Sequence, residues 1–271
     1  MPAHQLAEGG PVAAGRCVTG TSGWARDTCP VGLYRDEGVV LRTIRLGEAD
    51  RIVTVLTRGR GKVRAVAKGV RRTKSRFGAR LEPLAHVAML LYEGRELDVV
   101  TQAEALEHFR PVREDLDRLA KAHTLLEACD QVAQERQANV RLYQMLVGAL
   151  RALAGRDSPV LVPAFFLKVL ASEGACPMLD GCAGCGSPGA AVAFDVEEGG
   201  VLCPACAQRV SAPAISAPAL ELVRRVLTGD LVGALNHAAG PATGEVDRLA
   251  TRAMEHHLER RLRSVTVLDR A

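Results

Sequence analysis

The feature that most constrains the fold of this chain is a change in hydrophobic periodicity near residue 109. Between Glu37 and Ala105, apolar and polar residues alternate with a period of two, which is typical of strands with one buried face. Beyond Phe109, apolar residues recur at spacings of three and four, which indicates amphipathic helices. The pattern therefore predicts an α+β protein in which a strand-rich domain precedes a helical one.

The first part predicts five strands in about 70 residues, which suits a small closed barrel. Turn signals at 58–61 and 93–95 separate consecutive pairs. An OB-fold over residues 33–108 is the first candidate, although an SH3-like barrel would show much the same pattern. The predicted strands are Gly38–Leu46, Arg51–Thr57, Lys62–Lys68, Ala85–Tyr92 and Leu97–Glu104.

The second part predicts an all-helical domain made of residues 109–175 and 211–271. Asn139 and Ser216 have the side chains that favour helix starts, and a long helix beginning at Thr243 should continue through Arg263. A Gly- and Cys-rich interval at 176–210 interrupts the domain and is predicted to be a small inserted module.

Residues 1–32 show no periodicity and are rich in Gly, Ala, Pro and Thr, so we expect a disordered leader. One hypothesis is that translation starts at Val31, which would make the leader an artefact of the assigned start. No apolar run reaches the 18 or so residues of a membrane helix, and no signal peptide is evident. We therefore expect a cytoplasmic protein with reduced thiols.

The positive charge of the chain is concentrated in one segment. The formal net charge is +4, but the segment Arg51–Leu81 contains eleven Lys or Arg and no Asp or Glu, which leaves −7 for the rest. A basic block in an otherwise acidic protein favours a polyanionic partner. Composition alone does not separate nucleic acid from anionic lipid.

Two Cys-x-x-Cys pairs separated by seventeen residues predict a structural zinc site. Four thiolates at this spacing can surround Zn²⁺ tetrahedrally, and four cysteines leave no open position for catalysis. The alternative is four unrelated buried thiols. The zinc-deaminase pattern is not met, because Leu202 replaces its proline, and Cys176 is interpreted as a spare thiol. The predicted ligands of the single structural ion are Cys182, Cys185, Cys203 and Cys206.

The basic block predicts a nucleic-acid surface on the barrel. It combines the outward side of the third strand with the loop that follows, where such barrels bind nucleic acid; a solvated loop is the alternative. Only Tyr34, Phe77 and Tyr92 are available there to stack on bases, so binding should depend mainly on phosphates and little on sequence. The predicted DNA-binding residues are Arg42, Arg51, Lys62, Arg64, Lys68, Arg71, Arg72, Lys74, Arg76 and Arg80.

The sequence contains no recognisable catalytic constellation. A Walker A loop and the His-Glu-x-x-His and Gly-x-Ser-x-Gly motifs are all missing. His123 and His257 fall on predicted helix faces, where a core or surface histidine is the simpler interpretation. We therefore expect a protein that is not an enzyme.

Several motifs, taken in order, resemble the bacterial recombination mediator family RecO. Its N-terminal motifs are similar to residues 38–42, 47–51 and 66–76 (GVVLR, GEADR and VAKGVRRTKSR). The cysteine module and residues 257–264 (HLERRLRS) resemble its zinc insertion and C-terminal helix. The similarity extends from Leu33 nearly to the end of the chain.

The resemblance implies an OB domain joined to a helical domain with a zinc module. It also implies binding of single- and double-stranded DNA, annealing of complementary strands, and cooperation with RecR in loading RecA onto DNA coated by the single-stranded DNA-binding protein (SSB). The acidic SSB tail could pair with Arg260, Arg261 and Arg263, although a solvated helix face is the alternative. We thus expect a nucleoid-associated protein of DNA repair. An RNA-associated zinc-ribbon protein is the alternative, and a metal-dependent nucleic-acid enzyme comes third.

Overall fold

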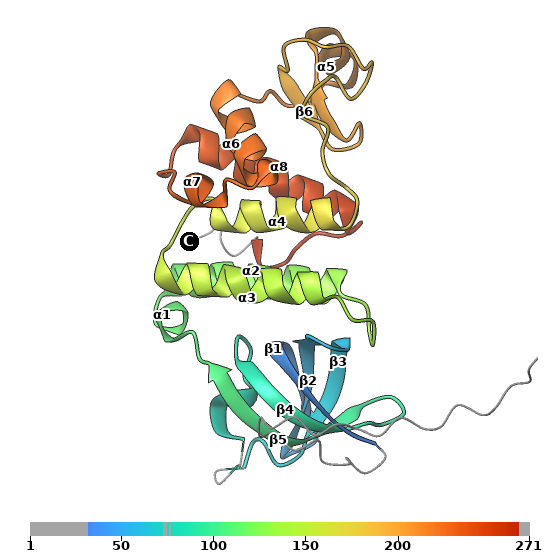
Figure 1. Cartoon of the computed structure of the whole chain (residues 1–271), viewed down its shortest axis with the longest axis vertical. Coiled ribbons are helices and arrows are strands. Elements are labelled where there is room, and N and C mark those ends of the chain that lie inside the picture. The colour runs from blue at the N-terminus through green and yellow to red at the C-terminus, as the bar shows by residue number, and fades with distance from the viewer. Residues whose placement is uncertain (1–31, 73–74, 76, 266–271) are drawn as a thin grey trace, which may run out of the picture.

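The computed structural model describes residues 32–72, 75 and 77–265, and every structural statement below concerns these residues. All of the predicted leader except Gly32, together with Lys74 and Arg76, lies outside them. Figure 1 shows three stacked parts: a β-barrel, layers of helices above it, and a small module at the opposite end.

The first part is a five-stranded closed barrel with the strand order β1-β2-β3-β5-β4. Neighbouring strands are antiparallel, except that β3 and β5 run parallel, with Ala65 beside Asp98. This OB-like barrel confirms the predicted fold class. Its strands are β1 (Leu33–Leu46), β2 (Asp50–Thr57), β3 (Gly61–Ala67), β4 (His86–Tyr92) and β5 (Asp98–Glu107).

The barrel core consists mainly of aliphatic side chains from alternate strand positions, and it also includes Phe77 and Leu81 from the segment between β3 and β4. Leu81 lies in a short 3₁₀ helix, η1 (Gly78–Leu81), between β3 and β4. Phe77 is 1% exposed, so the expectation that it is available for base stacking is wrong. Burying a large aromatic side chain in an apolar core is more favourable than leaving it in water.

Strand β1 begins five residues earlier than predicted. The polar residues Arg35, Asp36 and Glu37 conceal the strand in the sequence, but this segment pairs with β4 from Leu33 beside Tyr92 onward. Backbone pairing here extends the strand beyond its alternating apolar pattern.

The helices form two layers above the barrel. Helices α2 and α3 lie side by side next to the barrel, and α4, α6 and α8 form the next layer (Figure 1). Asn139 and Ser216 are the N-caps of α3 and α6, as predicted, because their side chains accept hydrogen bonds from the first helical turn. The helices are α1 (Arg110–Arg113), α2 (Leu116–Val132), α3 (Val140–Gly155), α4 (Leu161–Ser172), α6 (Ala217–Thr228), α7 (Leu231–Leu235) and α8 (Pro241–His257).

Barrel and helices share one apolar core along the outer side of β1 and β2. Val39, Leu41 and Leu56 of the barrel belong to the same buried cluster as α2, α3 and α4. Gly61 lies at this contact with a φ of 68°, and a Cβ atom there would approach the Gln137 carbonyl oxygen to 1.8 Å. Only glycine fits this position, so it allows the α2–α3 loop to pack directly on the start of β3.

The C-terminal helix ends earlier than predicted. Helix α8 stops at His257, and Glu259 then adopts a φ of 50°. The chain turns back so that Leu262 is buried at 2% exposure, and its backbone N–H donates to Glu255 Oε1 at 2.9 Å. The prediction that a helix extends through Arg263 is therefore wrong, because burial of Leu262 against the helical core requires a turn there.

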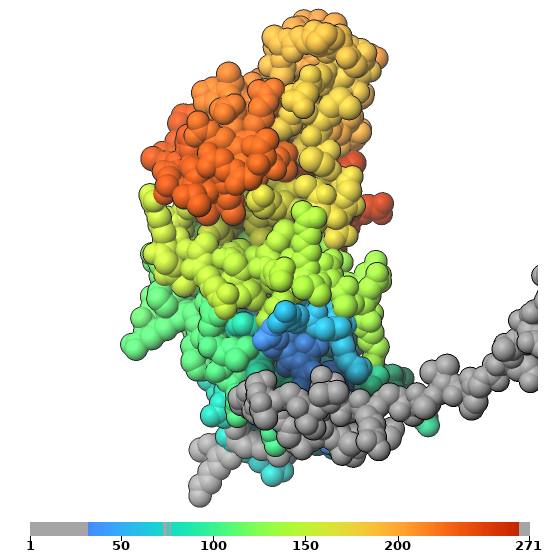
Figure 2. All heavy atoms as spheres, viewed as in Figure 1, coloured from blue at the N-terminus to red at the C-terminus, as the bar shows by residue number. Residues whose placement is uncertain are grey.

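The cysteine module forms a separate lobe, seen in amber in Figure 2 at the end farthest from the barrel. Its β6 (Ala193–Asp195) and β7 (Gly200–Leu202) form an antiparallel pair, followed by α5 (Pro204–Val210). Within the described residues, no helix is both long and apolar enough to cross a membrane.

Candidate nucleic-acid interface and metal centre

The outer faces of β1 and β3 carry three of the predicted cations, Arg42, Lys62 and Arg64. On β3, Val63, Ala65 and Ala67 are buried in the barrel, whereas Lys62 and Arg64 alternate with them on the outside, as predicted from the period of two. The strand register places Thr54 opposite Arg64 and, on its other side, opposite Arg42. The next row outward is apolar and contains Ile44, Ile52 and Val66.

Three of the predicted cations lie next to acidic side chains of the helical domain. Asp130 of α2 accepts from Arg42 Nε at 2.6 Å and lies 3.6 Å from Lys62 Nζ. Lys62 also donates to the Asp130 carbonyl oxygen at 2.6 Å. Arg64 lies 3.9 Å from Glu135. A phosphate group that bound these cations would first have to displace the two carboxylates.

Among the remaining described cations, Arg51, Lys68, Arg71 and Arg72 have no ion pair with the helical domain in the described residues. Arg51 pairs with Glu82 at 2.5 Å, and Arg80 is exposed on η1. Lys68, Arg71 and Arg72 are exposed in the segment that follows β3. We call these last three residues the basic tip.

Hydrogen bonds hold the basic tip against the β1–β2 turn. Arg71 donates from its guanidinium to the Glu48 carbonyl oxygen at 2.9 Å, and its backbone N–H donates to Ala49 at 3.0 Å. Gly69 N–H donates to Asp50 Oδ1 at 2.7 Å. Arg45 is exposed at the end of β1 on the same turn, and sequence reasoning missed it. The sequence offered one signal for Arg45, because this residue stands one position before the predicted end of the first strand.

The two remaining aromatic candidates differ in accessibility. Tyr34 donates its hydroxyl to Asp98, and the Arg60 guanidinium lies 3.8 Å from the centre of its ring. Tyr92 is 50% exposed at the end of β4. Only Tyr92 therefore offers an open ring face in the described part of the barrel, which favours binding through phosphates.

The predicted SSB-tail arginines do not share one helix face. Arg260 donates to Gln131 at 3.3 Å, and the backbone N–H of Arg263 donates to Glu127 at 3.0 Å, so this segment lies along α2. Arg260 and Arg263 line a groove of about 600 Å³ together with Arg42, whereas Arg261 is exposed outside it. The structure thus places Arg260 and Arg263 in the same groove as Arg42 of the barrel.

The four predicted metal ligands come together in the module. Cys182 and Cys185 lie in a turn before β6, Cys203 is the N-cap of α5, and Cys206 lies in its first turn. All four sulfur atoms lie within 4.8 Å of one another, and those of Cys185 and Cys203 are 3.9 Å apart. Sulfur atoms about 2.3 Å from one tetrahedral ion are about 3.8 Å apart, so the cluster could hold a metal ion such as zinc.

The local backbone favours thiolates at this cluster. The Cys203 backbone N–H donates to Cys182 Sγ at 3.3 Å, and this bond lowers the pKa of Cys182 to about 6. The neighbouring thiols, Cys182 first, raise the pKa of Cys206 to about 12. Four thiolates this close repel one another, so a cation is needed to ionise them together. A Cβ atom at Gly184 would lie 3.2 Å from Cys206 Sγ, so a larger residue there would crowd the sulfur cluster.

These features define a protein class in which an OB-like barrel with exposed cations joins a helical domain that carries a four-cysteine module. Residues 31–109 match the family model "Recombination protein O N terminal", and residues 113–266 match "Recombination protein O C terminal". The chain therefore belongs to the RecO family, which confirms the resemblance.

Two curated relatives, both named DNA repair protein RecO, are similar over nearly their whole length. The protein from Frankia casuarinae is 47% identical over 243 residues, covering 88% of this chain and 99% of the relative. The protein from a Nocardioides species is 46% identical over 246 residues, covering 88% of this chain and 100% of the relative.

Proposed function

We propose that this protein is a DNA repair and homologous recombination mediator of the cytoplasm and nucleoid. It binds single- and double-stranded DNA, anneals complementary strands and, together with RecR, helps RecA load onto SSB-coated single strands. The observation that carries the proposal is the family match to both halves of the chain, from residue 31 to residue 266. The same match disfavours the RNA-associated alternative.

DNA binding begins, in this proposal, at the basic tip. Lys68, Arg71 and Arg72 are exposed, and none of them pairs with a carboxylate among the described residues. Phosphates can reach these cations without moving the helices. The cations paired with Asp130 and Glu135 would join only after those ion pairs open. Because phosphates carry no sequence information, binding is largely independent of sequence.

Annealing requires no catalytic step in this proposal. Two complementary strands repel each other through their phosphates, and cations that replace condensed counterions reduce that repulsion. The protein then acts by bringing strands together rather than by making or breaking covalent bonds. Nucleotide hydrolysis has no role in it.

The four cysteines hold one structural Zn²⁺ in this proposal. The ion would be bound by the sulfur atoms of Cys182, Cys185, Cys203 and Cys206, whose separations suit tetrahedral coordination. The ion supplies folding energy to a lobe with a small core of its own.

The acidic SSB tail is proposed to bind at the groove that Arg260 and Arg263 line. Carboxylates would pair there with guanidinium groups, and Arg261 would add a further positive charge near the rim. Titration of a labelled tail peptide into an Arg260→Glu/Arg263→Glu variant tests this part; unchanged affinity would place the tail elsewhere.

An annealing assay with and without SSB tests the proposed function. The protein should accelerate annealing of complementary oligonucleotides without any nucleotide, and should still do so when SSB coats the strands. Heat-denatured protein is the control. Failure to accelerate annealing, or a marked preference for structured RNA over DNA, would contradict the proposal.

A further inference from the structure

The four clustered cysteines of the module differ in their exposure to solvent. Cys182 and Cys206 are 4% and 7% exposed, and they belong to the small apolar core of the module. Cys185 is exposed and Cys203 is half-buried. Each Cys-x-x-Cys pair therefore contributes one covered cysteine and one that solvent reaches. A small oxidant dissolved in water meets Cys185 and Cys203 first.

The two accessible cysteines are close enough to form a bond after a small movement. Their sulfur atoms are 3.9 Å apart. A disulfide requires a separation of about 2.0 Å, so the two atoms must approach each other by about 1.9 Å. Cys185 lies in a turn, and residues 186–190 after it are exposed and form no helix or strand. This segment can shift without disturbing a regular element.

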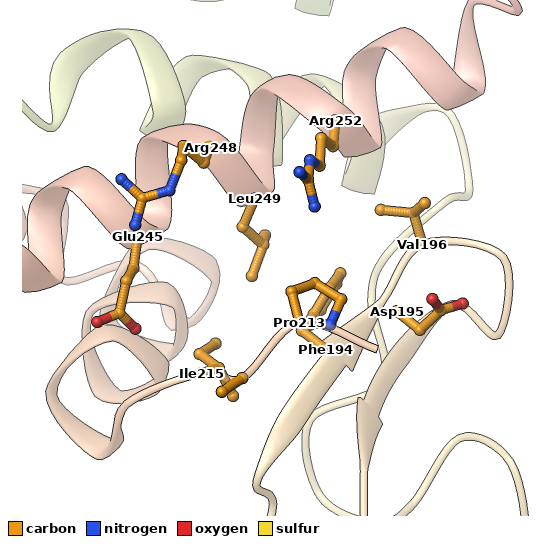
Figure 3. A pocket seen from close by; sticks show the side chains of 10 residues that line it. Phe194, Asp195, Val196, Pro213, Ile215, Glu245, Arg248, Leu249 and Arg252 are labelled. Atoms are coloured by element: carbon orange, nitrogen blue, oxygen red, sulfur yellow. The ribbon is translucent and has the colours of Figure 1, made fainter. Parts of the chain in front are cut away.

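The β6–β7 ribbon connects the cysteine cluster to the helical domain. On one face of the ribbon, Ala193 and Leu202 pack in the module core with the two buried cysteines. On the other face, Phe194 and Val201 belong to the core of the helical domain, because successive side chains of a strand point to opposite faces. Phe194 and Leu249 of α8 line a pocket at this junction (Figure 3). The packing of the ribbon on α8 therefore depends on an ordered cysteine cluster.

We propose that the module is an oxidation site at which hydrogen peroxide converts Cys185 and Cys203 to a disulfide. The proposal rests on the structural zinc site proposed above, because bound zinc keeps the thiols deprotonated and the thiolate is the form that attacks peroxide. The bond joins the two Cys-x-x-Cys pairs to each other. A disulfide within either pair would instead require one of the buried cysteines.

The reaction has two steps and transfers two electrons to the peroxide. The Cys185 sulfur attacks one peroxide oxygen, the O–O bond breaks, and a sulfenic acid and a hydroxide ion form. The Cys203 thiolate then attacks the sulfenic sulfur, which forms the S–S bond and releases a second hydroxide ion. The two sulfur atoms are thereby oxidised and the peroxide is reduced. Two protons from the solvent convert both hydroxide ions to water.

Oxidation at this site removes two of the four sulfur ligands. Cys182 and Cys206 alone cannot complete a tetrahedral shell, so zinc is released and its contribution to folding the module is lost. The β6–β7 ribbon then separates from α8, whereas the barrel at the opposite end of the molecule stays folded (Figure 2). Reduction of the disulfide by a thiol restores the ligands. The module thus acts as a reversible redox switch on its own docking to the helical domain.

Zinc release, disulfide mapping and proteolysis of the full-length protein test the proposal. Arg209 of α5 is the only Lys or Arg between Lys168 and Arg224, so tryptic cleavage after Arg209 reports opening of the module. Hydrogen peroxide should release about one zinc ion per chain, measured with a chromogenic chelator. Peptic peptides should contain the Cys185–Cys203 linkage, and cleavage after Arg209 should become about tenfold faster. Dithiothreitol with added zinc should restore the resistant form, and catalase-treated peroxide is the control.

A matched variant removes competing thiols outside the cluster. Cys17→Ser/Cys29→Ser/Cys176→Ser leaves buried Cys129 as the only other cysteine of the chain. This variant should release zinc and form the same linkage as the parent. DNA binding through the basic tip should be unchanged by oxidation, since the tip lies on the barrel.

Three results would overturn the proposal. One is full retention of zinc under peroxide that oxidises exposed Cys176 completely. Another is a disulfide within either Cys-x-x-Cys pair, and the third is zinc release that the triple variant does not show. A protein that contains no zinc before oxidation would contradict the proposed zinc site instead. The disulfide mapping would then decide the oxidation site by itself.

Discussion

The basic tip gives the most direct quantitative prediction for DNA binding. Replacing Lys68, Arg71 and Arg72 together with alanine removes three exposed cations. Each cation that neutralises one phosphate of a single strand contributes about 0.7 to the slope of log affinity against log salt concentration. If all three make such contacts, the variant should have a slope shallower by about two.

A slope change of this size is readily measurable. Raising salt from about 50 to about 200 mM changes its logarithm by about 0.6, so the parent should lose roughly twentyfold more affinity than the variant over this range. The loss should be similar for unrelated sequences, because phosphate contacts carry no sequence information. Annealing should slow in parallel.

The assay is a salt titration of fluorescence anisotropy with two unrelated single-stranded oligonucleotides. The matched control replaces Arg110, Arg141 and Arg225 of the helical domain with alanine, which changes net charge equally at exposed sites remote from the tip. The reasoning is refuted if the tip variant keeps the parental slope. It is also refuted if the control lowers the slope as much, because net charge rather than location would then govern binding.

Three further predictions concern the metal, the covered cations and pH. Cys203→Ser should abolish stoichiometric metal binding and unfold the module while the barrel stays folded, because structural zinc contributes about 10–16 kcal/mol in small sites; metal analysis and limited proteolysis check this, and full metal content would contradict it. Asp130→Asn should free Arg42 and steepen the single-strand salt slope by about 0.7, whereas an unaltered slope would exclude Arg42 from the DNA surface. Burial lowers the pKa of His86 from 6.5, so the unfolded chain binds more protons and stability should fall as pH drops below about 6.5. Urea unfolding of His86→Gln should show a weaker pH dependence, and an identical one would refute the assignment.

Contact between the helical domain and the barrel determines which barrel cations are already paired with carboxylates. His86 Nε2 lies 2.8 Å from the Tyr143 hydroxyl, and its side chain is 5% exposed, so this junction is closed to water. Together with Gly61 packed against the α2–α3 loop, it fixes the helices over the start of β3. The acidic end of α2 is thereby held next to the barrel cations.

Local patterns in the sequence were sufficient to predict most of the elements and the clustering of the four cysteines. The alternation along β3 separated buried Ala65 from outward Arg64 because successive side chains of a strand point to opposite faces. Asn139 identified a helix start because its side chain satisfies a free backbone N–H of the first turn. The spacing of the cysteine pairs predicted four sulfur atoms close enough to hold one ion, since each pair needs only a local turn to present two of them.

The tertiary structure alone decided which of these residues remain accessible. Phe77 is buried because its ring packs in the apolar core of the barrel, and α8 ends at His257 because Leu262 is buried against the helical core. Arg42 and Asp130 are 88 residues apart in sequence, yet their side chains form an ion pair. No local pattern encodes such a contact, because it depends on how two separately folded layers pack. The sequence thus determined the chemistry of the cations, and packing determined which of them can meet a phosphate.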